Sequence, residues 1–341
     1  MRRTGVLTVG VLAAVLLLPG CAQAGTAEAD PSPVGSLSTE AYVEPGDGAV
    51  SRVTDAGPRS AIIGVDGVTL QDSGAALAEP PAGLARLART AQHAGASAEL
   101  LLSNFSTSIG DFSPGVGTAL LSSGTNRERV ATAVARTASR DGFDGVQIDL
   151  ESLRGQDRAG LVAFTAAVRT AVHAEIGSDA RVSIAVMAST SGAGYRDTGY
   201  DLREIAANVD RVVLMTYDQH GPWSDPGPVG ALPWARQVVR AAEVAGVPRS
   251  RIDLGVAGYG YVWGGDDDAD AQVTAAEAER LAGDQARWSA STGEWSATLA
   301  DGRELHWSDA RSWRERRALA RELRLHGVAL WSLNTSSLPA D

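Results

Sequence analysis

The stretch at residues 143–151, with the sequence FDGVQIDLE, constrains the fold of this chain more than any other. Apolar and polar residues alternate along it, and this period of two predicts a β-strand with one apolar face and one acidic face. Asp149 and Glu151 are two positions apart and therefore point to the same side of the strand. Two carboxylates side by side in a fold interior are unfavourable unless a function requires them. We interpret them as a functional pair, and the alternative is an edge strand with a solvated acidic face.

Seven further segments have the composition of strands, and helical segments separate most of them. The helix expected at residues 156–176, for example, carries Leu161 and Val168 on one apolar stripe. Eight short apolar strands that alternate with helices are typical of a (β/α)8 TIM barrel, an α/β fold of about 250 residues. The strands are expected at residues 39–43, 60–68, 97–105, 143–151, 181–188, 211–217, 252–261 and 328–333. The helices are expected at residues 80–95, 126–140, 156–176, 233–245 and 308–326, with a further one that begins at Asp201.

A single barrel domain is expected over residues 39–341, with one interruption. Residues 266–307 are longer than an ordinary connection between barrel elements, so we expect them to form a small insertion after the seventh strand. The three aspartates at 266–268 are interpreted as a solvated acidic loop rather than as a cation site.

The N-terminal segment has the pattern of an export signal. Residues 1–21 contain two arginines followed by an apolar run that is too short to span a bilayer comfortably. The small residues before Cys21 resemble a bacterial lipobox, in which the cysteine is lipidated, and the alternative is an ordinary cleavage site just after it. Residues 22–38, rich in small residues and proline, are expected to be a flexible tether. We therefore expect an exported protein, lipid-anchored on the outer side of the membrane or secreted.

Charge and cysteine content exclude several classes of partner. The formal net charge is −11 over 341 residues, and basic clusters are lacking. Nucleic acids and anionic lipid surfaces attract positively charged proteins, so we expect no nucleic acid partner and no membrane contact beyond the lipid anchor. Cys21 is the single cysteine, which leaves no internal disulfide. A monomer is expected.

Polar and aromatic residues follow the expected strands at one end. In a barrel of this class the active site lies at the carboxyl ends of the strands. Tryptophan faces stack on sugar rings, and we interpret Trp331 in this way, whereas most tryptophans of the insertion are expected to serve packing. The residues at the expected carboxyl ends are Asn104, Asp149, Glu151, Tyr217, Asp218, Tyr259 and Trp331.

These motifs resemble glycoside hydrolase family 18, the chitinase-like family. Its fourth strand carries the signature D-x-x-D-x-D-x-E, and its sixth strand carries M-x-Y-D. Its eighth strand supplies a tryptophan below the sugar. The matching residues here are Asp144, Gln147, Asp149 and Glu151, then Met215, Tyr217 and Asp218, and finally Trp331. Residues 102–105, 215–223, 226–228 and 259–263 are similar to the bacterial spore-germination and cortex-lytic branch, whose members cut peptidoglycan at N-acetylglucosamine and often carry LysM repeats that are not found here.

The resemblance implies a mechanism in which the substrate assists its own hydrolysis with retention of configuration. Glu151 would serve as acid and then base, Asp149 would orient the acetamido group, and Tyr217 would donate to the acetamido oxygen. The substrate would be a β-1,4-linked N-acetylated glycan, either peptidoglycan or chitin oligomers, and neither a metal nor an organic cofactor is implied. The residues expected to bind it are Gln147, Asp144, Met215, Asp218, Trp331, Asn104 and Tyr259.

Gln147 departs from the family pattern, which has an aspartate there. A neutral amide cannot share a proton, but it can hydrogen-bond Asp149 and hold its rotamer. We therefore hypothesise that Asp149 stays ionised throughout the cycle. A sugar-binding lectin on the same barrel is the main alternative, and the presence of Glu151 favours the enzyme. A solute-capturing lipoprotein is a third interpretation, which the count of eight strands disfavours.

Overall fold

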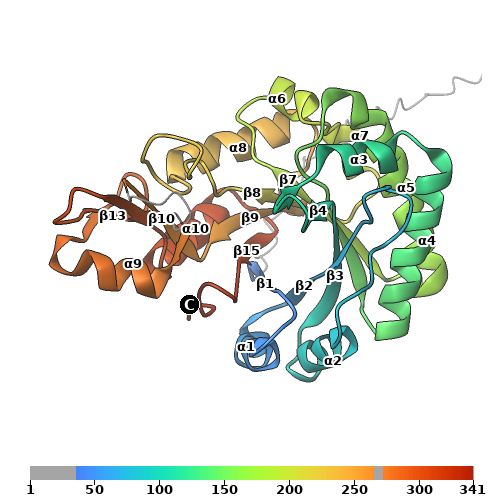
Figure 1. Ribbon diagram of the computed structural model, residues 1–341, viewed down its shortest axis with the longest axis horizontal. Coiled ribbons are helices and arrows are strands. Elements are labelled where there is room, and N and C mark those ends of the chain that lie inside the picture. The colour runs from blue at the N-terminus through green and yellow to red at the C-terminus, as the bar shows by residue number, and fades with distance from the viewer. Residues whose placement is uncertain (1–35, 265–271, 341) are drawn as a thin grey trace, which may run out of the picture. The chain divides into compact units, whose positions relative to one another are not determined.

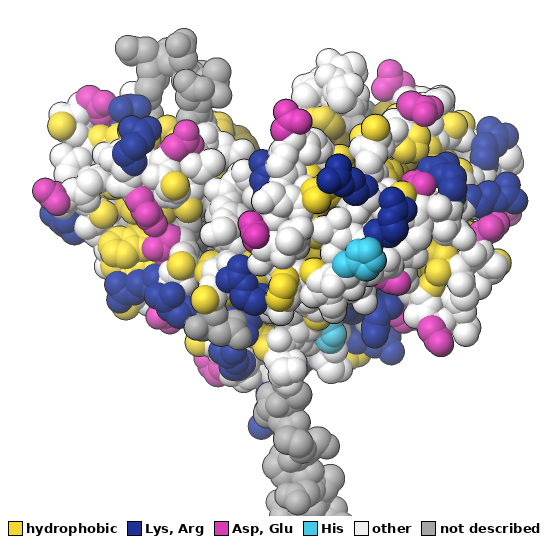
Figure 2. Space-filling view, turned by 90° about the horizontal axis from the view of Figure 1, so that it is seen from below, with side chains coloured by type: hydrophobic (Ala, Val, Ile, Leu, Met, Phe, Trp, Pro, Cys, Tyr) yellow, Lys and Arg dark blue, Asp and Glu magenta, His cyan; other side chains and the backbone are white. Residues whose placement is uncertain are grey.

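The computed structural model describes residues 36–264 and 272–340 (Figure 1). The expected signal peptide at 1–21, the candidate lipidation site Cys21, most of the tether and the aspartate run at 266–268 lie outside the described residues. Within the described ranges, none of the helices has the length and apolar character that a membrane span requires. On the face seen in Figure 2, acidic and basic side chains are interspersed.

Eight parallel strands close into a barrel in the order β1-β15-β9-β8-β7-β6-β3-β2, so the first strand pairs with the last. Each remaining barrel strand pairs with the barrel strands that come before and after it along the chain. The predicted (β/α)8 fold is confirmed. The strands are β1 (Ser38–Val43), β2 (Ile62–Thr69), β3 (Ser97–Ser103), β6 (Gly145–Asp149), β7 (Arg181–Met187), β8 (Arg211–Met215), β9 (Ile252–Ala257) and β15 (Gly327–Trp331).

Helices surround the barrel, as Figure 1 shows. The outward residues of the strands, such as Val146 and Ile148 of β6, are fully buried in one core with apolar residues of the helices, including Val134 and Phe164. Burial of this face is the main driving force for closing the barrel. The helices outside the insertion are α1 (Ala49–Ala56), α2 (Leu84–His93), α3 (Pro114–Leu121), α4 (Gly124–Asp141), α5 (Arg158–Glu175), α6 (Gly192–Asp197), α7 (Leu202–Ala206), α8 (Leu232–Val244) and α10 (Ala310–Glu322).

Some helix starts differ from those expected, and the helix expected from residue 80 begins at Leu84. Helix α4 begins earlier than residue 126, because the hydroxyl of Ser123 accepts the backbone N–H of Asn126 at 3.2 Å and is the cap. The helix expected to begin at Asp201 is present, with Asp201 as the N-cap residue of α7, but its side chain makes no capping hydrogen bond and the helix is only one turn long. The end of α4 agrees with expectation, since Gly142 has a φ of 79°, which glycine adopts without strain.

The insertion begins at Tyr259 rather than at residue 266. The expected seventh strand is two elements, because β9 ends at Ala257 and β10 (Tyr259–Trp263) joins a separate antiparallel sheet. Both segments are apolar and mostly buried, so sequence periodicity does not separate them. Trp295 stacks on Trp307 within this sheet, in the packing role expected of them. The other elements of the insertion are β11 (Gln272–Thr274), α9 (Ala275–Ala282), β12 (Arg287–Ser289), β13 (Glu294–Thr298) and β14 (Glu304–Trp307).

Candidate active site

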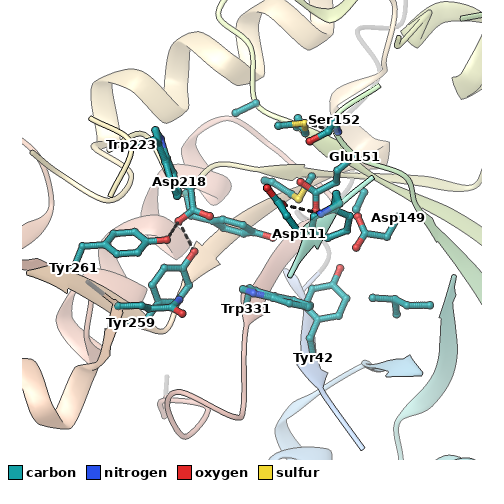
Figure 3. Close-up of a pocket in the computed structure, with 18 of the residues that line it drawn as sticks. Tyr42, Asp111, Asp149, Glu151, Ser152, Asp218, Trp223, Tyr259, Tyr261 and Trp331 are labelled. Atoms are coloured by element: carbon teal, nitrogen blue, oxygen red, sulfur yellow. Dashed lines mark hydrogen bonds between the residues drawn. The ribbon is translucent and has the colours of Figure 1, made fainter. Parts of the chain in front are cut away.

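A cleft of about 590 Å³ lies over the carboxyl ends of the barrel strands, a volume typical of small-molecule sites. The barrel supplies its floor, and the start of the insertion supplies one wall (Figure 3). Most of the residues expected from the sequence are thus brought together in one place. Those that line the cleft are Gln147, Asp149, Glu151, Met215, Tyr217, Asp218, Tyr259 and Trp331.

The backbone of Glu151 is held by a side chain from a neighbouring strand. The N–H of Glu151 donates to Oδ1 of Asn104 at 2.9 Å, and Nδ2 of Asn104 donates to the carbonyl oxygen of Glu151 at 2.9 Å. Tyr200 donates to the preceding carbonyl, that of Leu150, at 2.8 Å. Asn104 is fully buried and does not line the cleft. We expected it to contact sugar, but its contacts fix the position of Glu151 instead.

Asp144 is not a substrate-binding residue in this structure. It precedes β6 and therefore lies at the amino end of the barrel, opposite the cleft. Its Oδ2 accepts the N–H of Ala98 at 2.8 Å and Nε2 of Gln92 at 3.1 Å. It thereby ties α2 to the beginnings of β3 and β6. The expectation from the motif is wrong for this position. The five residues of β6 span the barrel wall, so Asp144 before the strand and Asp149 at its end lie at opposite ends of the barrel.

Asp218 has a constrained backbone and a doubly bonded side chain. Its φ is 58°, in the left-handed region that non-glycine residues rarely occupy. The hydroxyls of Tyr259 and Tyr261 both donate to its Oδ1, at 2.6 and 2.8 Å (Figure 3). Burial raises the pKa of Asp218, and the two hydrogen bonds oppose that rise. Tyr259 lines the cleft as expected, but its hydroxyl is engaged by Asp218.

Burial and neighbouring negative charges raise the pKa of both members of the carboxyl pair. Burial, followed by the charge of Asp66, raises the pKa of Asp149 to about 8. Burial also raises the pKa of Glu151 well above its usual value, with contributions from Asp149, Asp218 and Asp111. Our hypothesis that Asp149 stays ionised is therefore wrong for the substrate-free protein at neutral pH. A carboxyl group that holds its proton to neutral pH can act as a general acid.

Gln147 does not hold the rotamer of Asp149. Its Nε2 donates to Oε1 of Glu40 at 3.2 Å and to the hydroxyl of Ser183 at 2.9 Å. Oδ1 of Asp149 is buried without a hydrogen-bond partner in the part of the chain that the structure describes. The expected bond between the two side chains is not formed, because the amide of Gln147 donates to Glu40 and Ser183 instead.

A buried ionic cluster explains this orientation. Arg211 pairs with Glu40 at 2.9 Å, with Glu99 at 2.8 Å and with Asp253 at 2.5 Å, and all four side chains are at most 2% exposed. Burial raises the pKa of Glu40 to about 7, although Arg211 opposes the rise. Nδ1 of His326 donates to Oδ1 of Asp253 at 2.6 Å. The cluster fills the barrel interior toward the amino ends of the strands. Glu40, a member of the cluster, accepts the hydrogen bond that orients the amide of Gln147.

Comparison with known proteins agrees with this geometry. The profile of the family described as glycosyl hydrolases family 18 matches residues 87–335. The chain belongs to glycoside hydrolase family 18. It is 28% identical over 325 residues to the cortical fragment-lytic enzyme of Bacillus subtilis (strain 168), across 90% of this chain and 73% of that one. The predicted resemblance, including the cortex-lytic branch, is confirmed, and the protein is a glycoside hydrolase.

Solved structures share the fold of this family 18 hydrolase. The spore cortex-lytic enzyme SleL of Bacillus cereus superposes with a TM-score of 0.76 at 21% identity, over 88% of this chain and 71% of that one. A chitinase of Chromobacterium violaceum ATCC 12472 superposes with a TM-score of 0.77 at 23% identity, over 88% and 95% of the two chains.

The site of this hydrolase contains residues that sequence reasoning missed. Tyr42 of β1 packs against Trp331, with ring centroids 5.3 Å apart. Asp111 lines the cleft from β5 (Asp111–Phe112), which forms a hairpin with β4 (Phe105–Ser106). Asp66 is the single charged residue in the mostly apolar strand β2, and this feature of the sequence could have marked it as a candidate functional residue. The charged residues at inward positions of β1, β3, β8 and β9 gave a similar signal for the ionic cluster.

Proposed function

We propose that this enzyme hydrolyses β-1,4-linked glycans that contain N-acetylglucosamine, with retention of configuration. The observation that carries the proposal is that Glu151, Asp149 and Trp331 lie in one cleft (Figure 3), which Tyr217 also lines. Two protonatable carboxyls beside a tyrosine and an indole suit acid-assisted cleavage of a sugar bound on an aromatic surface.

Glu151 is the proposed general acid and base. Its raised pKa supplies a proton for the leaving glycosidic oxygen, and the same carboxylate then accepts a proton from water. The buried clamp of Asn104 fixes the backbone from which this side chain extends. Accurate placement of the acid accounts for a large part of the rate in such reactions.

The acetamido group of the substrate is the proposed nucleophile. Its carbonyl oxygen attacks the anomeric carbon, the glycosidic bond breaks, and an oxazolinium intermediate forms. Asp149 accepts the acetamido N–H and, once ionised, stabilises the developing positive charge. Tyr217 donates to the acetamido oxygen and orients it. Water then opens the oxazolinium ring with Glu151 as base, which restores the acetamido group and retains the configuration.

The remaining cleft residues bind the sugar. Trp331 stacks beneath its ring with Tyr42 behind it, and Met215 and Asp218 shape the pocket around the acetamido group. The names of the compared proteins suggest two polymers, since one is a cortical fragment-lytic enzyme and another is a chitinase. Peptidoglycan fragments and chitin oligomers are therefore the proposed substrates.

Export is part of the proposal. Residues 1–21 direct the chain out of the cytoplasm, Cys21 carries a lipid, and residues 22–38 connect this anchor to a monomeric barrel. Incorporation of radiolabelled palmitate into the wild-type protein but not into Cys21→Ser supports the anchor. Equal labelling of both proteins, or of neither, contradicts it.

The decisive experiment measures cleavage of chitin oligomers and solubilised peptidoglycan by the wild-type protein and by Glu151→Gln, with products read by mass spectrometry. Glu128→Gln is the matched control, because Glu128 is exposed on α4. Cleavage that is lost only in Glu151→Gln supports the proposal, and a β-configured product at early times, read by proton NMR, supports retention. Sugar binding without cleavage by the wild type refutes it and favours the lectin alternative.

A further inference from the structure

Asp66 points into the barrel at the level of the active site. In the parallel pairing of β2 with β3 it lies opposite Leu101, which lines the cleft, and Leu101 in turn lies opposite Gln147 of β6. Paired residues of neighbouring strands face the same side of a sheet, so Asp66, Leu101 and Gln147 all face inward. Asp149 is the next inward residue of β6 after Gln147. Asp66 and Asp149 are thus on strands separated by two spacings, roughly 10 Å between backbones, with side chains that converge.

A local irregularity fixes this placement. The register between β2 and β3 shifts immediately after Asp66, so that Val68 rather than Gly67 pairs with Leu102. A side chain at Gly67 would meet Leu84 of α2 at 2.5 Å, so glycine allows the close approach of this helix. Bulges of this kind commonly redirect a side chain beside an active site.

Neither Asp66 nor Asp149 has a cationic partner among the described residues. Asp66 is partly exposed, and its carboxylate has no hydrogen bond or ion pair with any residue in the described ranges. Oδ1 of Asp149 is likewise without a partner there. Gln147, the inward residue of β6 before Asp149, is uncharged. Its amide donates hydrogen bonds to Glu40 and Ser183. The negative charge of Asp66 therefore acts on Asp149 without an intervening cation.

We propose that Asp66 is a positioning residue of the hydrolysis site, whose negative charge keeps a proton on Asp149 in the substrate-free enzyme. This inference rests on the proposed role of Asp149. The proton is needed because Asp149 is buried next to the partly buried Glu151, and two adjacent carboxylates repel each other. When substrate binds, the acetamido N–H and the developing positive charge favour the ionised form, and Asp149 releases its proton to solvent water.

The order of titration agrees with the proposal. Burial, with a contribution from Glu44, raises the pKa of Asp66 to about 6, below the value of about 8 for Asp149. At neutral pH Asp66 is therefore mainly ionised while Asp149 is mainly protonated. Beyond burial, Asp66 is the charge that raises the pKa of Asp149. The other titratable groups around the pair are Tyr42, Glu44, Asp111, Glu151, Tyr200, Tyr217 and Asp218.

The test is an NMR titration of the intact protein with aspartate labelled at the carboxyl carbon. The signal that disappears in Asp149→Asn identifies Asp149. Asp66→Asn removes the negative charge at nearly constant shape, so the midpoint for Asp149 is expected to fall by about one pH unit. Asp66→Glu retains the charge and is expected to keep the midpoint near the wild-type value. Asp55→Asn controls for net charge, because Asp55 is exposed on α1.

The inference is overturned if the titration midpoint of Asp149 in Asp66→Asn lies within about 0.2 pH units of the wild-type value. Removal of a charge that raises the pKa of Asp149 shifts the midpoint by more than this. Asp66→Ser is the second neutral variant, to be titrated in the same way if Asp66→Asn does not fold. The titration needs no turnover. Failure of the enzyme to cleave glycans would therefore refute the proposed function separately, whatever the midpoint of Asp149.

Discussion

The side-chain amide of Asn104 closes a two-bond ring with the backbone of Glu151, in which each residue both donates and accepts. Asn104 immediately follows β3, and Glu151 lies two residues beyond the end of β6. The ring therefore joins two adjacent barrel strands at the point where the proposed acid leaves the barrel wall. A third donor, the hydroxyl of Tyr200, bonds the carbonyl of Leu150 next to it.

Replacement of Asn104 by alanine should lower kcat more than it changes KM. The variant loses both bonds and leaves the N–H and C=O of Glu151 unpaired, so the acid shifts from its reactive position, which costs about 10- to 100-fold in kcat. Steady-state kinetics on a chitin oligomer measure this. Asn126→Ala is the control, because it removes a hydrogen bond from a side-chain amide to the carbonyl of Ala119 on α3, outside the cleft. An unchanged kcat in Asn104→Ala contradicts a positioning role.

Tyr259 and Tyr261 should act as a pair on Asp218. Either Tyr→Phe variant leaves one hydroxyl on Oδ1, whereas the double variant leaves none and allows the pKa of Asp218 to rise further. We expect small losses of kcat/KM in the single variants and a disproportionate loss in the double variant, with a coupling energy of about 0.5–3 kcal/mol. Comparison of all four proteins gives this coupling. Losses that simply add would show that the two hydroxyls act independently.

Arg211 should be essential for stability. Its replacement by methionine leaves Glu40, Glu99 and Asp253 buried without their shared cation, at a cost of about 3–5 kcal/mol in the free energy of unfolding. Addition of Glu99→Gln should recover part of this loss, because it removes one of the uncompensated charges. Urea denaturation measures both effects.

The control for Arg211 is Arg236→Met. Arg236 pairs with Glu322 on the surface, where the two side chains are 43% and 60% exposed. Exposed ion pairs contribute less than about 1 kcal/mol, so little destabilisation is expected. Equal losses in the two arginine variants would contradict a special role for the buried cluster.

The stability of the enzyme should fall between pH 5 and pH 8. The pKa of Asp149 is about 8 in the folded protein and has its low, ordinary value when the chain is unfolded, so the folded state binds the proton more tightly. The resulting stabilisation is fully present below the unfolded pKa and is lost as pH rises through the folded pKa. Glu40 and Asp66, with pKa values of about 7 and 6, act in the same direction.

Asp149→Asn should flatten this dependence, because asparagine does not titrate. The variant is expected to gain stability relative to wild type at pH 8 and much less at pH 5, as measured by urea midpoints at both values. Asp55→Asn, at an exposed position, should keep the wild-type decline. The same decline in Asp149→Asn as in wild type would mean that Asp149 is already ionised in the folded protein.

The sequence by itself was sufficient for the barrel and for much of its active rim. Alternation of apolar and polar residues is set by neighbours along the chain, so the strand that ends at Asp149 could be predicted together with the direction of its side chains. The position of Tyr217 and Trp331 followed, because parallel strands present their carboxyl ends at one edge. The same local reasoning misplaced the start of the insertion, since the apolar run continues from β9 into β10.

Only the tertiary structure decided what these residues contact. Arg211 meets Glu40 across 171 positions of sequence, and Asn104 meets Glu151 across 47. Such pairs depend on the register of strands and on barrel closure, neither of which is written in any one segment. The protonation of Asp149 depends in the same way on burial and on a charge from β2. Local pattern fixes which face a side chain takes, whereas its partners and proton affinity arise from groups that folding brings together.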